Sequence, residues 1–361
     1  MKTTSSIKPE IKKLLHDGTV IPAHPLALNA SRKLDEKRQR GLTQYYIAAG
    51  AGGVAVGVHS TQFEIRDPAI NLYTRVLELA SEEIRSAALT RPFIKIAGLV
   101  GPTDQAISEA RTAISLGYDI GLLSMGGLKD WTEEQILARV KAVAAVIPVF
   151  GFYLQPSVGG RIFTYDFWLE FARIPEVVAI KVAAFDRYQT LDVVRAVCAS
   201  GRHEEIALYT GNDDNIIHDL LTTYRFKVNG KKIAKEFVGG LLGHWGVWTS
   251  KAVALLQDIK ECKSSGMANI NELLARGIEV TDMNAAIFDP AHNFHGCIPG
   301  IHEVLRRQGL LEGRWCLNPQ EELSPGQMLE IDRVCKAYPH LTDDEFVRDL
   351  LEQDVVQRKS L

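Results

Sequence analysis

The feature that most constrains the fold of this chain is a regular return of short apolar runs. Runs begin near residues 93, 119, 148, 177 and 206, so successive starts lie about 26 to 29 residues apart. This is the length of one strand followed by one crossover helix. The segments between the runs carry helix signals, such as the capping box from Thr132 to Gln135. The spacing therefore predicts repeated β/α units with parallel strands.

Counting strands over the whole chain gives eight, which favours a closed (β/α)8 TIM barrel over an open sheet. The expected strands start near residues 20, 54, 93, 120, 148, 177, 206 and 237. A helix is expected over residues 31–49. Residues 225–233 predict a hairpin around an Asn229-Gly230 turn, interpreted as a surface insertion in preference to a lid or subunit arm.

After residue 248 the strand signals stop, and the remaining sequence predicts only helices, including one over residues 301–308. The α/β class is thus a TIM barrel with a C-terminal helical extension. The expected domain boundaries are an N-terminal extension over residues 1–18, the barrel over 19–262 and the helical domain over 263–361.

Composition excludes several classes of partner. The net charge of -3 offers no basic surface for nucleic acid, and no apolar run approaches the roughly 18 residues of a membrane span. The N-terminus lacks the apolar centre of a secretory signal, so the expected location is cytoplasmic. Five scattered cysteines show no C-x-x-C spacing. We therefore expect a small-molecule substrate, with neither nucleic acid nor membrane as a partner.

No cofactor is expected either. A glycine-rich match to the dinucleotide fingerprint begins at Gly50, but a predicted helix precedes it and a strand follows. The fingerprint requires the opposite order, because the phosphates bind at the start of the helix that follows the strand.

One lysine stands out in the apolar, β-branched run of residues 177–184. On a barrel strand, Lys181 would point into the lumen near the mouth, where barrel enzymes carry out chemistry. Apolar surroundings disfavour its ammonium form, which leaves a free amine to attack a carbonyl carbon. Tyr153, at a similar depth on the neighbouring strand, is expected to face Lys181 and relay protons. A structural lysine that reaches the rim or pairs with a carboxylate is the alternative interpretation.

These residues give the chain a resemblance to the dihydrodipicolinate synthase and N-acetylneuraminate lyase family of class I, Schiff-base aldolases, as a divergent member. Residues 148–156 resemble the family's tyrosine-bearing strand, which ends in Y-N-x-P, and residues 178–181 resemble its G-I-K strand. Gly211-Asn212-Asp213 resembles the G-D-D turn. The resemblance implies a substrate imine on Lys181, a proton-relay role for Tyr153 and a homo-oligomer, either a tetramer or a dimer.

The departures from the family concern the pocket that selects the substrate. The family's G-T-T-G-E loop, whose hydroxyls hold a pyruvate-type carboxylate, corresponds to residues 57–61, where Val58 has no polar side chain. The family's P-P-Y-Y segment is replaced by residues 124–128. The arginine that the family carries two residues beyond the proline of its tyrosine-bearing strand is replaced by Val158, with Arg161 as the one nearby substitute. These changes argue against dihydrodipicolinate synthesis itself.

The expected catalytic residues are Lys181 and Tyr153. The expected substrate-binding residues are His59, Ser60, Thr61, Gln155, Gly211, Asn212, Asp213 and His244. They predict a class I lyase, aldolase or dehydratase acting on a 2-oxo acid or related carbonyl compound. A barrel that binds such a ligand without turnover is the alternative.

A third hypothesis is a metal-dependent lyase or hydrolase. It draws on His292, His295, Cys297 and His302, all of them residue types that bind zinc. Proline and glycine in this stretch predict a loop between helices, and loop histidines are usually solvated, so no metal site is expected.

Overall fold

The computed structural model describes residues 7–359 of the 361-residue chain, with side chains described as far as residue 353. Eight parallel strands form a barrel, in which each strand pairs with its neighbours and β1 pairs with the last strand. A parallel bridge between Ala23 and Ala55 joins the first strand to the second. The predicted (β/α)8 barrel is therefore confirmed. The barrel strands are β1 (Val20–Pro22), β2 (Gly53–Val56), β3 (Ile94–Leu99), β4 (Ile120–Ser124), β5 (Val149–Leu154), β6 (Val177–Ala183), β7 (Ala207–Thr210) and β9 (Lys231–Leu242).

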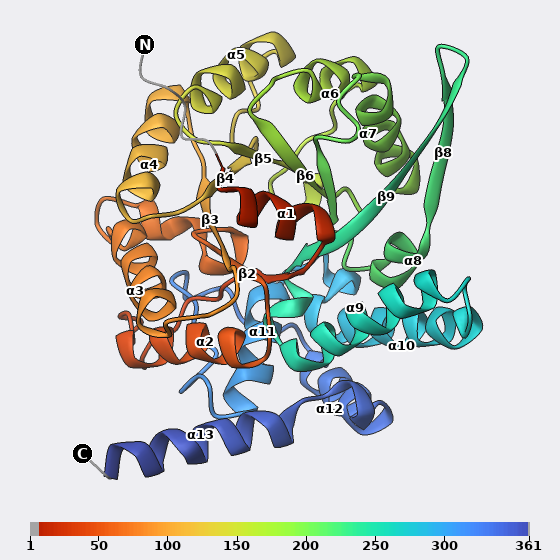
Figure 1. Cartoon of the computed structure of the whole chain (residues 1–361). Coiled ribbons are helices and arrows are strands. Elements are labelled where there is room, and N and C mark those ends of the chain that lie inside the picture. Colours follow the sequence, from red (N-terminus) through yellow and green to blue (C-terminus); the bar gives the residue numbers. More distant parts are fainter. Residues whose placement is uncertain (1–6, 360–361) are drawn as a thin grey trace.

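Helices cover the outside of the barrel (Figure 1), with their apolar faces packed against the strands. At the start of α5 the predicted capping box is present, because the Thr132 hydroxyl accepts the Gln135 backbone N–H and the Gln135 side chain accepts the Thr132 N–H. The outer helices are α2 (Glu36–Ala48), α3 (Tyr73–Ser86), α4 (Thr103–Ser115), α5 (Glu133–Ala144), α6 (Tyr165–Ala172), α7 (Arg187–Ala199) and α8 (Ile216–Leu221).

The expected helix over residues 31–49 starts later than predicted. The Asn29 carbonyl accepts the Arg32 N–H, and the Asn29 N–H donates to the Lys33 carbonyl, which forms a turn. The Asp35 side chain then caps α2 by accepting the Arg38 N–H at 3.1 Å. An aspartate at the N-cap satisfies a backbone donor that has no partner inside the helix.

Helix α1 (Pro9–Asp17) lies across one end of the barrel (Figure 1). Ile11 and Leu15 are buried in the same apolar cluster as the barrel interior, and the Tyr209 hydroxyl donates to the Leu15 carbonyl at 2.9 Å. Because α1 leads directly into β1, the end that it closes is the amino end of the strands. The opposite end, where the strands finish, is left for a pocket.

The predicted hairpin is also confirmed. Strand β8 (Thr223–Val228) pairs antiparallel with the first half of β9, and the pair projects from the barrel (Figure 1). Asn229 and Gly230 have φ of 49° and 81°, as the two central residues of a type I′ turn require.

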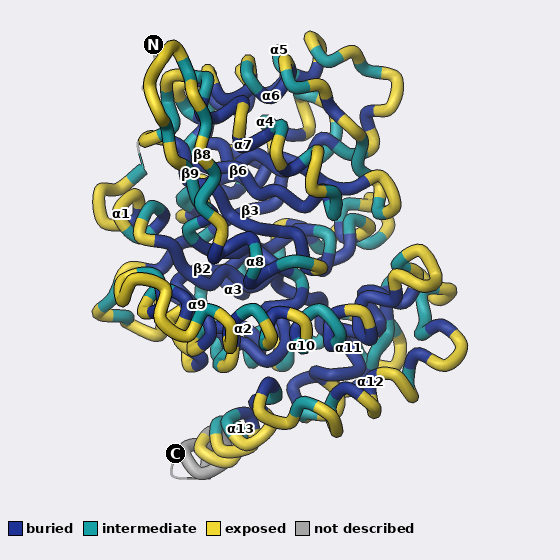
Figure 2. Tube along the Cα trace, turned by 90° about the vertical axis from the view of Figure 1, so that its right-hand side faces the viewer, coloured by how far each residue is buried: buried dark blue, intermediate teal, exposed yellow. Residues whose placement is uncertain are grey.

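The C-terminal part of the chain is helical and packs beside the barrel, with its inner helices buried (Figure 2). Its helices are α9 (Thr249–Ser264), α10 (Ile270–Phe288), α11 (Cys297–Arg307), α12 (Gln327–Ala337) and α13 (Asp344–Lys359). Within the described residues, no helix has the length and apolar character needed to cross a membrane.

The predicted loop around residues 292–302 is wrong in its second half, since α11 begins at Cys297 and not near residue 301. Pro299 lies in the first turn of α11, where the helix has no use for the backbone N–H that proline lacks.

Candidate active site

Lys181 lies inside the barrel near the carboxyl end of β6. Ala179 and Ala183, two residues before and after it, belong to the interior cluster, so the alternation of the strand turns Lys181 inward. Its side chain is 7% exposed. A Cβ on Gly211, at the end of β7, would lie only 2.5 Å from the Lys181 Cε. The glycine therefore leaves the room that the lysine side chain occupies.

The surroundings of Lys181 favour a neutral amine. Burial lowers its pKa to about 8, although the negative charge of Asp213 acts in the opposite direction. The Nζ atom lies 4.4 Å from the centroid of the Phe152 ring, over its face, and this contact favours the ammonium form, in the same direction as the charge of Asp213. A lysine with this pKa has an appreciable fraction of free amine at neutral pH, which is the form that attacks a carbonyl carbon.

Asp213 follows β7 and is the acidic partner of this lysine. Burial raises its pKa to about 7, with the charge of Lys181 and the His244 backbone N–H opposing the rise. Its Oδ1 accepts that N–H at 2.9 Å, which fixes the carboxyl group beside the pocket. Lys181 and Asp213 thus form a buried acid and base that both titrate near neutral pH, a combination typical of catalytic sites.

Tyr153 does not face Lys181, so this expectation is wrong. In β5 the interior side chains are Phe150, Phe152 and Leu154, and Phe152 is the residue paired with Lys181. Tyr153 points outward, where its ring packs against Trp168 and its hydroxyl donates to Gln189 Oε1 at 2.7 Å. Neighbouring residues of a strand point to opposite faces, and Phe152 takes the interior position.

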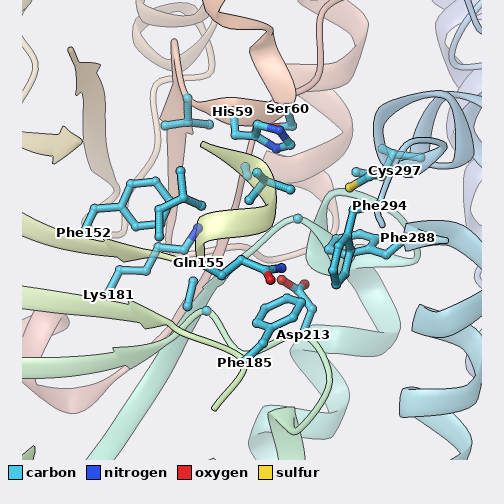
Figure 3. Close-up of a pocket in the computed structure, with 18 residues that line it drawn as sticks. His59, Ser60, Phe152, Gln155, Lys181, Phe185, Asp213, Phe288, Phe294 and Cys297 are labelled. Atoms are coloured by element: carbon cyan, nitrogen blue, oxygen red, sulfur yellow. The ribbon is translucent and has the colours of Figure 1, made fainter. Parts of the chain in front are cut away.

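The pocket around Lys181 has an empty volume of about 570 Å³ (Figure 3). In the figure the lysine amine points into the pocket, with His59 and Ser60 on one side and the rings of Phe185, Phe288 and Phe294 around Asp213. A more open groove adjoins it and shares His59, Val158 and Phe294 with it. The lining residues missed from the sequence are mainly apolar: Phe152, Phe185, Phe288, Phe294, Cys297 and Ile301.

Part of this lining had a signal in the sequence. Phe185 comes two residues after the end of β6, at the end of the barrel where sites form. Phe294, Cys297 and Ile301 come from the stretch that was singled out for its histidines, and it is the apolar residues of that stretch that reach the pocket. Phe288, the last residue of α10, has no such signal.

Five of the eight expected substrate-binding residues line this pocket together with Lys181. They are His59, Ser60, Gln155, Gly211 and Asp213. The pKa of His59 is lowered to about 4, mainly by burial and further by the charge of Lys181, so its ring is neutral at pH 7.

Thr61 does not reach the pocket. Its hydroxyl donates to the His24 carbonyl at 2.6 Å and accepts the N–H groups of Gly57 and Val58 at 3.0 and 3.2 Å. It is fully buried and holds the loop in shape. The expectation of a substrate contact from Thr61 is therefore wrong.

Asn212 and His244 also serve the structure of the site without lining the pocket. The Asn212 Oδ1 accepts the Phe185 N–H at 2.9 Å, and its Nδ2 donates to Asp219 at 2.9 Å. Phe185 has a φ of 52°, a left-handed conformation that is strained for a bulky residue. The His244 ring packs against Trp248 on the side away from the pocket, and only its backbone N–H, through Asp213, contributes to the site.

The histidines of the metal hypothesis do not form a ligand set. His292 is half-exposed and pairs with Asp289 at 2.6 Å, whereas His302 is buried within α11 beside the Arg314 carbonyl. Over residues 7–353, whose side chains are described, no group of three His, Cys, Asp or Glu side chains is arranged to hold a metal ion.

No protein-family profile matches the sequence, and no curated protein matches it either. Solved structures do match in fold. Dihydrodipicolinate synthase from Oceanobacillus iheyensis superposes with a TM-score of 0.70 at 19% identity, covering 91% of this chain and 99% of that one. N-acetylneuraminate lyase from Fusobacterium nucleatum gives a TM-score of 0.68 at 16% identity, covering 90% and 99%. This chain therefore has the barrel fold, with C-terminal helices, of the dihydrodipicolinate synthases and N-acetylneuraminate lyases.

Proposed function

We propose that this chain is a divergent member of the dihydrodipicolinate synthase and N-acetylneuraminate lyase family. Its proposed activity is that of a class I lyase, which forms an imine between Lys181 and a small carbonyl compound. The observation that carries the proposal is the buried amine of Lys181 at the wall of the pocket, with its pKa lowered by burial. At 19% identity or less, the related structures support the fold, and the chemistry is argued from the site.

The proposed reaction begins when the neutral amine of Lys181 adds to the carbonyl carbon. The nitrogen loses a proton, the oxygen gains two protons in turn, and water leaves, which gives an iminium ion. A hydroxyl two carbons from the iminium carbon then gives up its proton and becomes a carbonyl. The bond between that carbon and the carbon next to the iminium carbon breaks. Its electron pair forms the C=C bond of an enamine, and the π pair of the C=N bond moves to the nitrogen. Protonation of the enamine carbon and addition of water release the second product and restore Lys181.

Asp213 is the proposed proton carrier in these steps. Its carboxylate takes the hydroxyl proton, and its acid form returns a proton to the enamine carbon. A carboxyl group whose pKa is raised to about 7 suits both tasks, because proton exchange is most efficient near the working pH. Lys181 and Asp213 both line the pocket, and the charge of each acts on the pKa of the other. The substrate's reacting atoms are proposed to lie between the two groups.

The test is reductive trapping with a panel of carbonyl compounds that includes 2-oxo acids and uncharged aldehydes and ketones. Borohydride reduces an imine to a stable amine, so the intact mass rises by the mass of the bound compound less one oxygen atom, because water leaves and two hydrogens are added. Peptide mapping should locate the adduct on Lys181, and Lys181→Ala should lose it.

Lys95→Ala is the matched control. Lys95 also lies on a barrel strand and has a pKa lowered by burial, but its amine contacts Ser81 outside the pocket. It should leave the adduct unchanged. Absence of a Lys181 adduct across the whole panel would refute the lyase proposal. Thermal stabilisation by the same compounds without an adduct would then favour a barrel that only binds its ligand.

A further inference from the structure

The walls of the Lys181 pocket are mostly apolar and aromatic. Phe152 lies beside the amine, and Phe185 and Phe294 pack edge to face with ring centroids 5.6 Å apart. Phe288 and Ile301 complete this side of the pocket. Binding an apolar group here removes its surface from water at about 25 cal/mol per Å². A ligand with a phenyl-sized group therefore gains affinity that a small, charged ligand cannot.

The pocket has no fixed cation to hold a carboxylate. Arg161, the one substitute for the missing family arginine, donates to the carbonyls of Leu128 and Trp131 and lies over the Phe163 ring. It is not among the residues that line the pocket. His59 is neutral, and Lys181 itself must be uncharged in order to attack. No permanent positive charge thus remains near the carbonyl site in the described part of the chain.

The hydrogen-bond donors of the loop after β2 do not compensate for the missing cation. The Gly57 and Val58 N–H groups donate to the Thr61 hydroxyl, and that hydroxyl donates to the His24 carbonyl. The Ser60 hydroxyl donates to the same carbonyl at 3.3 Å. Val58 presents only methyl groups to the pocket. These donors are therefore already engaged with the protein. The neutral His59 ring and the Gln155 amide can still donate, but neither carries a positive charge to offset that of a carboxylate removed from water.

Asp213 adds a further penalty, since its carboxyl group lines the same pocket and is 5% exposed. A ligand carboxylate next to the reacting carbonyl would bring two negative charges together in a buried space. Building on the proposed function, we infer that the carbonyl compound bound at Lys181 is an uncharged aldehyde or ketone with an apolar or aromatic substituent, and has no carboxylate next to its carbonyl.

Two compounds with the same tail test this inference. 4-Phenylbutan-2-one is a methyl ketone, and 2-oxo-4-phenylbutanoate carries a carboxylate in place of the methyl group. Pyruvate serves as the 2-oxo acid without the tail. Each compound is trapped on the protein with cyanoborohydride. Its rate of labelling at Lys181 is divided by the rate at which the same compound labels free lysine in solution. This division removes the higher intrinsic reactivity of 2-oxo acids.

The methyl ketone should label Lys181 at least about tenfold faster than its 2-oxo acid partner on this scale. Labelling by the 2-oxo acids that equals or exceeds labelling by the ketone would overturn the inference and leave the imine proposal standing. If no compound labels Lys181, the proposed function fails, and the inference fails with it.

Variants test separately the two parts of the inference, which are the exclusion of a carboxylate and the binding of an apolar substituent. Asp213→Asn and Val58→Thr should each shift the labelling ratio toward the 2-oxo acid, because one removes a negative charge and the other adds a hydroxyl. Phe294→Ala should raise the ketone concentration at half-saturation about tenfold, since it removes part of the apolar wall. Phe63→Ala is its control, because Phe63 lines the adjoining groove and not the pocket. Unchanged ratios in both polar variants, or equal effects of the two alanine variants, would contradict the inference.

Discussion

The amine nitrogen of Lys181 lies 4.4 Å from the centroid of the Phe152 ring. The face of an aromatic ring attracts a cation, and in a buried site this attraction contributes up to about 2 kcal/mol. The iminium ion proposed for the reaction would carry its positive charge at the same nitrogen. Phe152 therefore occupies the position best suited to stabilise that charge without supplying a proton.

Phe152→Leu should slow the trapping of the imine. The variant keeps an apolar side chain but removes the ring face, so we expect labelling of Lys181 to fall by about three- to thirtyfold. Phe150→Leu is the control, since Phe150 is an interior residue of the same strand that packs against Tyr209. Equal losses in both variants would mean that the effect comes from packing in the barrel.

The rate of labelling should depend on pH in a predictable direction. Burial lowers the pKa of Lys181 to about 8, and labelling requires the free amine. With Asp213 as the proton donor, the rate should rise with pH toward about 8 as the amine loses its proton, and fall at higher pH as the acid form of Asp213 is lost. The charge of Asp213 raises the lysine pKa, so Asp213→Asn should move the midpoint of the rise to lower pH. A midpoint near 10.5, the ordinary value for lysine, would contradict this description of the site.

Tyr153→Phe and Asp213→Asn should differ sharply in their effect on imine formation. The Tyr153 hydroxyl bonds to Gln189 outside the barrel, so its loss should cost about 1 kcal/mol of stability and change labelling by less than about twofold. Asp213→Asn should slow labelling by about 100-fold. The comparison is made at about pH 7, where the acid form of Asp213 is present, and each rate is divided by the fraction of free amine in that protein. Strong loss of labelling in Tyr153→Phe would return the proton-relay role to the tyrosine.

The barrel could be predicted from the sequence because each β/α unit leaves a complete local signal. A run that is apolar on both faces marks a strand buried between interior and helices, and the capping box at Thr132 marks the helix start. The spacing of these signals is set by the length of one unit. The start of α2 was missed because Asp35, and not the apolar pattern, decides where that helix begins.

The site was predicted less completely, because the inward or outward direction of a residue depends on register. The pairing of β5 with β6 shifts by one residue between Val149 and Phe150. A shift of one residue exchanges the faces of a strand, so the spacing of Tyr153 and Lys181 along the chain does not fix whether they face each other. The aromatic wall was missed for a different reason. Phe288 approaches the barrel from the end of α10, and such long-range packing leaves no local pattern. Phe294 lies in the stretch that was singled out, but the histidines there directed attention away from its apolar residues.

Asn212→Ala should loosen the wall of the pocket without touching the ligand directly. Asn212 accepts the Phe185 N–H and bonds to the buried Asp219, so its loss leaves Phe185 free to leave its left-handed conformation. We expect the free energy of unfolding to fall by about 2 kcal/mol, measured by urea denaturation. Saturation by 4-phenylbutan-2-one should also require a higher concentration, because Phe185 lines the pocket.

Asn215→Ala provides the matched comparison for this prediction. Asn215 also donates to Asp219, at 3.2 Å, but makes no hydrogen bond to Phe185. It should lower stability by a smaller amount and leave the ketone concentration at half-saturation unchanged. If both asparagine variants lose stability but bind the ketone equally well, Asn212 contributes only to the packing around Asp219. If Asn212→Ala alone weakens binding, the strained conformation of Phe185 is part of what shapes the apolar site.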